Sequence, residues 1–396
     1  MSRLIPFRRF LTTTTTALQL THHTKPAVES KLKHHLSLSF EKEYKIRSSL
    51  ETLISDYSAK KVPPITLDSL IELSKHRDDQ LSKQTLNYLT YFNVKRLKAF
   101  RSLPYLVVLN PHISSTYQSY LKSLELLLNI SGEQIKNDEL IYDTLTQFYD
   151  IHSDAIPSLS KGFQEVSIFY PKSSIVEFLN RHFHDKINMD IIANNYIQAV
   201  DTCSQKDHIG IVGKALHISE LIKVYAGFVN DMTFIKYYKQ VPVKITAGED
   251  ITFPYIGQHL EYVITEILKN SIRSHIENDR ADTAIQVTIS QSKEGSKSTL
   301  GIRFRDEGNG IPPEIERNIF DYSFTSVTKQ DKNKGMADNS MPGEDIDTVA
   351  GMGYGLPLTK AYVEQFGGSL DIQSVYGFGT DVYIELVGPD ETKFDD

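Results

Sequence analysis

The sequence has 396 residues, of which 40% are hydrophobic and 23% charged, so it is long enough for about two folded domains with separate cores. A formal net charge of -7 gives no general attraction to nucleic acid. The single cysteine, Cys203, excludes an internal disulfide and a cysteine-rich zinc site. No apolar run reaches the ~18 to 20 residues of a membrane-spanning helix.

The N-terminal segment differs in composition from the rest of the chain. Residues 1–28 include four arginine and lysine residues and the hydroxyl run Thr12 to Thr16, and the first acidic residue is Glu29. A basic, hydroxyl-rich and acid-free segment is typical of a mitochondrial transit peptide. The alternative is a basic terminal tail without that role. We expect residues 1–28 to be a cleaved leader and exclude them from the fold.

Residues 31–225 predict an up-and-down bundle of four helices with a regulatory or docking role. Apolar residues recur at spacings of three and four in segments 113–130, 140–149 and 175–183, and proline or glycine pairs separate the segments. The predicted buried stripe of the first segment consists of Tyr117, Tyr120, Leu121, Leu124, Leu127 and Leu128.

Residues 226–396 have a different pattern. Apolar and polar residues alternate in five short segments, which predicts half-buried strands at 241–245, 285–289, 300–304, 370–372 and 382–386. Helices are predicted at 257–277 and 357–366. The fold class is therefore α+β, with the helical bundle followed by an α/β sandwich.

Three polar residues share one side of the helix predicted at 257–277. Glu266, Asn270 and Arg273 are spaced at i, i+4 and i+7, so their side chains project together. Taken alone, this arrangement is more typical of a solvated helix face, with Glu266 as one more surface acid.

Three glycine-rich segments follow that helix. Asp306-Glu307-Gly308-Asn309-Gly310 ends a predicted strand and leaves room for a flat ligand against the backbone. The run from Gly351 to Leu356 opens a helix, whose free N–H groups suit phosphate. The third segment, Gly377 to Thr380, is a tight turn before the last strand. A dinucleotide-binding fold would need a strand directly before Gly351, where the sequence has a charged loop.

The order of these motifs resembles the ATP domain shared by DNA gyrase, heat-shock chaperones, histidine kinases and mismatch-repair ATPases, the Bergerat fold. Within that group, residues 265–274, 351–357 and 366–370 resemble the mitochondrial kinases of pyruvate and branched-chain 2-oxoacid dehydrogenases. In the helical half, residues 96–105 are similar to the same family.

The resemblance implies a nucleotide site and ATP and Mg²⁺ as cofactors. The expected nucleotide-binding residues are Glu266, Asn270, Arg273, Asp306, Gly308, Gly310, Thr325, Ser326, Gly351, Met352, Gly353, Tyr354, Gly355, Leu356 and Thr380. Glu266 is the expected catalytic base that accepts the proton of a substrate serine. Asn270 is the expected Mg²⁺ ligand, and Asp306 is expected to accept the adenine amino group.

The sequence also departs from the family pattern. Pyruvate-specific members often have a histidine one turn before the base, where this chain has Tyr262. The phosphoacceptor box of sensor histidine kinases is absent, and His182 and His184 are interpreted as surface or structural residues. The chain has no tryptophan, so the Asp-Trp tail motif of pyruvate dehydrogenase kinases is missing.

The sequence therefore predicts a protein-serine kinase of the mitochondrial matrix that phosphorylates and inactivates the decarboxylase alpha subunit of the pyruvate dehydrogenase complex. The same reaction on the branched-chain complex is the second candidate function. Expected partners are that subunit, the lipoyl-bearing acyltransferase core, and a second copy or a related kinase in a dimer. A conformational ATPase would predict a further transducer domain, and a silent docking protein would predict a defective ATP site.

Overall fold

The computed structural model describes residues 40–75, 79–130, 132–153, 155–201, 207–322 and 354–394. The predicted leader lies outside these residues. Contacts divide the chain into two compact units, residues 1–53 and 54–396, and the division falls inside α2 (Phe40–Ala59). The second unit contains all the other described helices and strands.

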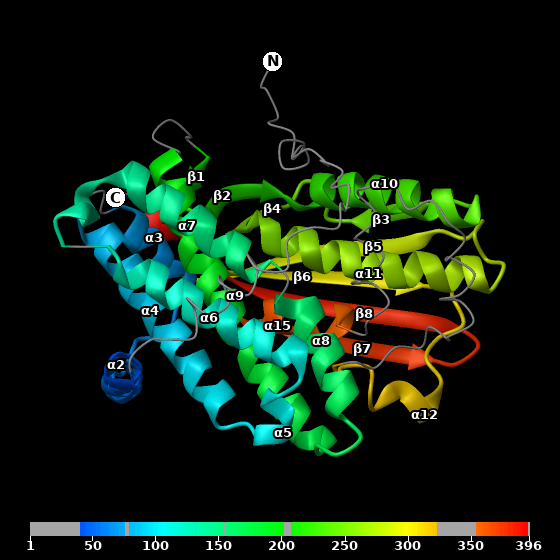
Figure 1. Cartoon of the computed structure of the whole chain (residues 1–396). Helices are drawn as coiled ribbons and strands as arrows, with labels where there is room; N and C mark the ends of the chain where they lie inside the picture. The colour runs from blue at the N-terminus through cyan, green and yellow to red at the C-terminus, as the bar shows by residue number, and fades with distance from the viewer. Residues whose placement is uncertain are drawn as a thin grey trace, which may run out of the picture. The chain divides into compact units, whose positions relative to one another are not determined.

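Helices make up the first half of this unit, as the sequence predicts. Four of them form a closed ring in which α4 contacts α6, α6 contacts α7, α7 contacts α9, and α9 contacts α4 (Figure 1). Asparagine caps and prolines mark several helix starts. Asn110, which directly precedes Pro111, accepts hydrogen bonds from two backbone N–H groups in the first turn of α6. The helices are α3 (Leu67–Lys75), α4 (Asp79–Arg101), α5 (Tyr105–Val108), α6 (Pro111–Leu128), α7 (Asp138–His152), α8 (Ala155–Val166) and α9 (Lys172–Asp201).

The second half of the unit contains two sheets. The larger sheet has the order β3-β5-β6-β8-β7, and its strands overlap all five predicted segments. A smaller sheet, of order β1-β2-β4, was not predicted. The strands are β1 (His208–Ile209), β2 (Val212–His217), β3 (Val243–Ala247), β4 (Thr252–Ile256), β5 (Ile285–Glu294), β6 (Lys297–Asp306), β7 (Ser369–Val375) and β8 (Gly379–Asp390).

Helices line the larger sheet and form its core with the inward side chains of the strands. The helix α11 (Gly257–Glu277) has the predicted bounds and contacts β6, while α15 (Gly355–Glu364) contacts β7 and β8. Next to α11 lies α10 (Ile218–Tyr237), which was not predicted (Figure 1). Short α12 (Pro313–Glu316) follows β6. The mixed α+β class is confirmed.

Two details differ from the sequence analysis or extend it. Leu128, predicted in the buried stripe of α6, is 51% exposed although its neighbour Leu127 is buried. Tyr117 and Leu121 of the same stripe are half-buried. The predicted division of the chain at 225/226 falls inside α10, and residues 54–396 form one compact unit. The division into a bundle and an ATP domain therefore stays a prediction.

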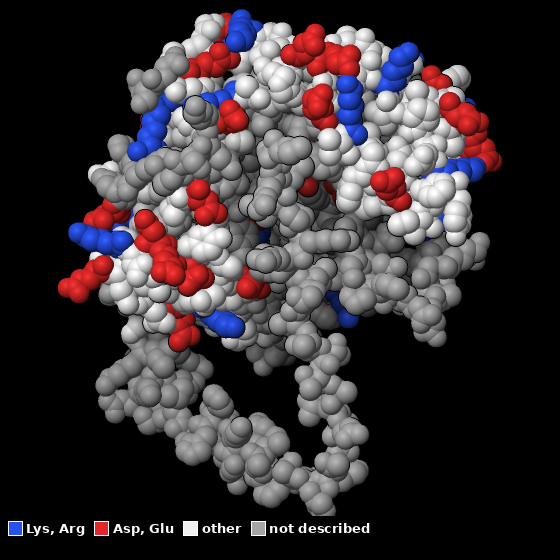
Figure 2. Space-filling model, turned by 90° about the horizontal axis from the view of Figure 1, so that it is seen from above, with Lys and Arg blue, Asp and Glu red and all other residues white. Residues whose placement is uncertain are grey.

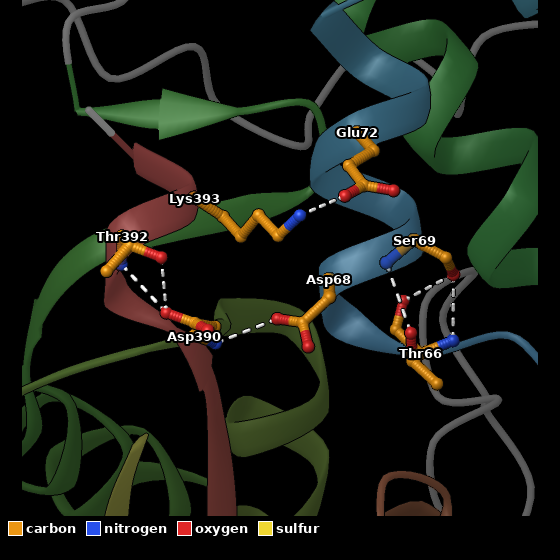
Figure 3. A network of polar contacts seen from close by, with 7 residues as sticks. All are labelled: Thr66, Asp68, Ser69, Glu72, Asp390, Thr392 and Lys393. Atoms are coloured by element: carbon orange, nitrogen blue, oxygen red, sulfur yellow. Dashed lines mark hydrogen bonds and ion pairs between the residues drawn. The ribbon is translucent and has the colours of Figure 1, made fainter. Parts of the chain in front are cut away.

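Hydrogen bonds join the helical half to the sheet half at several places, among them the C-terminus and the end of α15. Near the C-terminus, the Asp390 N–H donates to Asp68 Oδ1 of α3 at 2.8 Å, and Lys393 of η2 (Glu391–Phe394) donates to Glu72 (Figure 3). Beside α15, Gln365 Nε2 donates to Asn188 Oδ1 of α9 at 2.8 Å. The bundle is thus joined to the C-terminal end of α15.

Charged side chains do not gather into one large patch on the face shown in Figure 2, where lysine and arginine are interspersed with aspartate and glutamate. This mixture agrees with the net charge of -7 and offers no stripe of positive charge for a polyanion on that face. Among the described residues, no helix is both long and apolar enough to cross a membrane.

Candidate active site

The three polar residues predicted to project together from α11 lie in different surroundings. Glu266 is buried, with 8% of its surface exposed, whereas Asn270 is exposed. Arg273 is half-buried, and its Nε donates to Glu277 Oε1 at 2.6 Å. The structure therefore brings Glu266 and Asn270 to one part of the helix and pairs Arg273 with a neighbouring carboxylate.

Glu266 lies between α11 and the start of α15. Its Oε1 accepts a hydrogen bond from Lys269 Nζ at 2.7 Å, and a Cβ atom on Gly355 would collide with its Oε2. One turn earlier, the ring of Tyr262 packs against Tyr362 of α15, and burial followed by the Glu266 charge holds the pKa of Tyr262 well above its ordinary value. The expected base thus faces the N-terminus of α15.

Asp306 ends β6 and is buried, with 6% of its surface exposed. Its Oδ1 accepts from the Gly308 N–H at 2.9 Å and its Oδ2 from Ser271 Oγ at 3.3 Å. Burial raises the pKa of Asp306 above its ordinary value of 3.8, and the hydrogen bond from Gly308 opposes that rise. Thr380 pairs with Asp306 across β6 and β8.

Neighbouring groups lie close to the glycines that follow Asp306 and precede Thr380, which explains the glycines of two motifs. A Cβ on Gly308 would collide with Ser274. Gly310 has a φ of 69°, and a Cβ there would lie 2.5 Å from the Val375 carbonyl oxygen. Gly379, which the sequence analysis did not assign to the site, has a φ of 137° and would collide with the Asp306 carbonyl. Larger residues at these positions would displace the backbone around Asp306.

Among the described residues, no side chain caps the N–H groups at the start of α15. The N-cap residue Tyr354 is buried against Phe183 and Tyr322 and makes no side-chain capping hydrogen bond, and Leu356 is half-buried. Free N–H groups at a helix N-terminus bind anions such as phosphate. The remaining predicted nucleotide-binding residues lie outside the described residues: Thr325, Ser326, Gly351, Met352 and Gly353.

Sequence reasoning missed the residues that hold the loop after Asp306. His275 Nε2 accepts from the Glu307 N–H at 2.9 Å, and Ser274 Oγ accepts from the Asn309 N–H at 3.3 Å. Arg280 donates to the Glu307 carbonyl at 2.6 Å. The sequence signal for these contacts was the presence of polar residues near the C-terminal end of the helix predicted at 257–277, followed later in the chain by a glycine-rich loop.

The described residues fit ATP with Mg²⁺. Asp306 and the close backbone around it suit an adenine ring, and the uncapped α15 suits phosphates. Within the described ranges, no cluster of three or more His, Cys, Asp or Glu could hold a metal ion by itself. Mg²⁺ commonly takes one or two protein ligands and completes its shell with phosphate oxygens and water, so the exposed amide of Asn270 is a suitable single ligand.

The strand order, α11 and the glycine turns define a class of ATP-binding domain. Residues 256–389 match the family described as histidine kinase-, DNA gyrase B- and HSP90-like ATPase. Residues 64–213 match the family described as mitochondrial branched-chain alpha-ketoacid dehydrogenase kinase.

Whole-chain relatives narrow this class. The chain is 40% identical to [pyruvate dehydrogenase (acetyl-transferring)] kinase 1, mitochondrial, of Saccharomyces cerevisiae, over 90% of this chain and 91% of that protein. It is 24% identical to the mitochondrial kinase of that name in Arabidopsis thaliana, over 74% and 80% of the two chains, and 25% identical to human isozyme 1, over 75% and 71%. The chain therefore belongs to the mitochondrial pyruvate dehydrogenase kinase family, and the predicted ATP-dependent protein kinase is confirmed at that level.

Proposed function

We propose that this chain phosphorylates a serine of the decarboxylase alpha subunit of the mitochondrial pyruvate dehydrogenase complex and thereby inactivates that complex in the matrix. The relatives named above are pyruvate dehydrogenase kinases, which supports this substrate. The observation that carries the chemistry is the position of Glu266, a buried carboxylate against the phosphate-binding end of α15.

The proposed roles follow from the site. Asp306 accepts a hydrogen bond from the adenine amino group, and the N–H groups at the start of α15 hold phosphate oxygens. Asn270 holds Mg²⁺, which would neutralise phosphate charge when bound. Glu266 accepts the proton of the substrate serine as the serine oxygen attacks the terminal phosphorus.

Further proposals concern location and assembly. Residues 1–28 are a leader removed on import, and the mature protein associates with the lipoyl-bearing acyltransferase core. It pairs with a second copy or with a related kinase. On the face shown in Figure 2, the charges of the described residues are mixed, which gives no support for a nucleic-acid partner there.

Incubation with labelled ATP and each purified 2-oxoacid dehydrogenase complex tests the substrate. We expect label on the decarboxylase alpha subunit of the pyruvate complex, with a parallel loss of that complex's activity. Label confined to the branched-chain complex would favour the second candidate function, which the match of residues 64–213 supports. ATP hydrolysis without label on either complex would contradict a kinase.

Replacing Asn270 with alanine tests the metal site. Loss of the proposed protein ligand should weaken Mg²⁺-dependent ATP binding by on the order of 10- to 100-fold, since even indirect partners of a bound metal have effects of that size. Calorimetric titration with and without Mg²⁺ measures this change. Gln258→Ala removes an exposed amide from the same helix and should leave binding unchanged. If Asn270→Ala and Gln258→Ala bind ATP with equal affinity in the presence of Mg²⁺, the protein ligand of Mg²⁺ is another residue.

A further inference from the structure

Lys269 has no role in the proposed site, yet it is the nearest charged neighbour of the expected base. Its Nζ lies 2.7 Å from Glu266 Oε1, and the two side chains are 16% and 11% exposed. A partly buried ion pair of this kind is screened by solvent much less than a surface pair. Lys269 therefore affects how Glu266 can act.

In this structure, both oxygens of Glu266 have close neighbours. Oε1 accepts from Lys269, and Oε2 lies so close to Gly355 that a Cβ there would collide with it. A base must come within hydrogen-bond reach, about 2.6 to 3.2 Å, of the proton that it accepts. The hydrogen bond from Lys269 occupies one lone pair of Oε1, so releasing Lys269 makes Glu266 more available to accept a serine proton.

Lys269 is placed to make that release. Lys269 directly precedes Asn270, the proposed Mg²⁺ ligand. The Glu266 carboxylate, to which Lys269 donates, contacts the first residue of α15, whose N–H groups are the proposed phosphate site. The other cation of this helix segment, Arg273, donates instead to Glu277. Lysine has a flexible stem and three donors, and a terminal phosphate carries more negative charge than one carboxylate. A phosphate at α15 would compete with Glu266 for Lys269.

We propose that Lys269 is a positioning residue that exchanges partners during the reaction. It holds Glu266 until ATP binds and then moves to the terminal phosphate, which frees Glu266 to accept the serine proton. The serine oxygen then bonds to the terminal phosphorus, the bond to the β-phosphate oxygen breaks, and ADP leaves. ADP lacks the terminal phosphate, so Lys269 stays on Glu266 when ADP is bound. This exchange depends on the proposed kinase function.

A double-mutant cycle on nucleotide affinity tests the exchange without a protein substrate. The variants are Glu266→Gln, Lys269→Met and their combination, titrated with Mg²⁺ and either ADP or the β,γ-imido analogue of ATP. Direct effects of each charge on phosphate add, so non-additivity measures how the Lys269–Glu266 pair changes on binding. Glu266→Gln changes affinity for the analogue by some factor in the protein that keeps Lys269 and by another factor in the Lys269→Met background. We expect the first factor to favour binding about three- to tenfold more than the second. For ADP, the effect of Glu266→Gln on affinity should be the same in both backgrounds within about twofold.

Additive effects on analogue affinity, or equal non-additivity with ADP, would overturn the exchange and leave the kinase proposal standing. Failure of the wild-type protein to bind the analogue would overturn both. Lys269→Gln provides a second neutral substitution that keeps a hydrogen-bond donor, in case Lys269→Met does not fold. The matched control is the exposed pair Lys223 and Glu249. A cycle of Lys223→Met and Glu249→Gln should be additive for both nucleotides.

Discussion

Replacing Glu266 with glutamine is expected to slow phosphotransfer by ~10² to 10⁴-fold, about 3 to 5 kcal/mol of barrier, because that is the usual contribution of a general base. Glutamine keeps the shape of the side chain and its hydrogen-bonding capacity but cannot accept the serine proton. Affinity for nucleotide should stay within an order of magnitude of wild type. Single-turnover transfer of labelled phosphate to the decarboxylase subunit measures the rate, and calorimetry measures affinity.

The control for this prediction is Glu261→Gln, which makes the same chemical change at an exposed position of α11. It should leave both rate and affinity near wild type. Lost nucleotide binding in Glu266→Gln, with an unchanged rate per bound nucleotide, would make Glu266 a nucleotide ligand. If both quantities match wild type, the chemistry lies on another element.

Local periodicity predicted α11 to the residue but not the burial of its functional side chains. The spacing of Glu266, Asn270 and Arg273 places them on one side of a helix, as predicted. Glu266 is nevertheless buried, because the first residue of α15, far along the chain, packs against it. Arg273 turns to Glu277. A contact with a distant segment decides the burial of Glu266, whereas the Arg273–Glu277 pair is an i,i+4 contact within α11.

The elements that the sequence analysis missed have mixed or continuous patterns. Strand β4 has four consecutive buried residues, Phe253 to Ile256, so it lacks the alternation that marks a half-buried strand. Helix α10 carries exposed apolar side chains, such as Val224 and Ile235, which blur its buried stripe. The sequences of β4 and α10 therefore show no clear period of apolar residues from which a strand or a helix could be predicted.

Polar residues inside the helical bundle were also beyond local prediction. His182 is fully buried, which agrees with a structural role, and its Nε2 lies 3.4 Å from Tyr120 Oη. His152 is also buried, and its Nε2 lies 3.0 Å from Ser123 Oγ. These contacts join α6 to α7 and α9, so they depend on how the helices pack. They have a consequence for stability.

Three buried histidines should make the fold acid-labile. Burial lowers the pKa of His152 and of His259 to about 3 and holds the pKa of His182 well below its ordinary 6.5. Nearby positive groups act in the same direction, Lys186 at His152 and Arg96 at His182. Because all three are neutral in the folded protein, the unfolded chain takes up more protons once the pH falls below about 6.5.

The sign and size follow from linkage. A lowered folded-state pKa means that the stabilisation is complete above about pH 6.5 and is lost as pH falls toward 3. Each group can remove about 1.4 kcal/mol per pH unit, so three remove about 4 kcal/mol per unit well below pH 6.5. Asp190 and Asp306, whose pKa values are raised by burial, oppose this trend only where carboxylates titrate. Urea unfolding at pH 7.5, 6.5 and 5.5 measures the slope.

His259→Phe isolates one of the three contributions. His259 stacks on Phe366 with ring centroids 6.0 Å apart, and its Nδ1 has no hydrogen-bond partner among the described residues, so a phenyl ring can occupy its place. We expect the slope of unfolding free energy against pH below 6.5 to fall by about 1.4 kcal/mol per unit, which is one proton. His217→Gln, at an exposed position, should leave the slope unchanged. A His259→Phe slope equal to wild type would mean that His259 is protonated in the folded protein, against the burial that lowers its pKa.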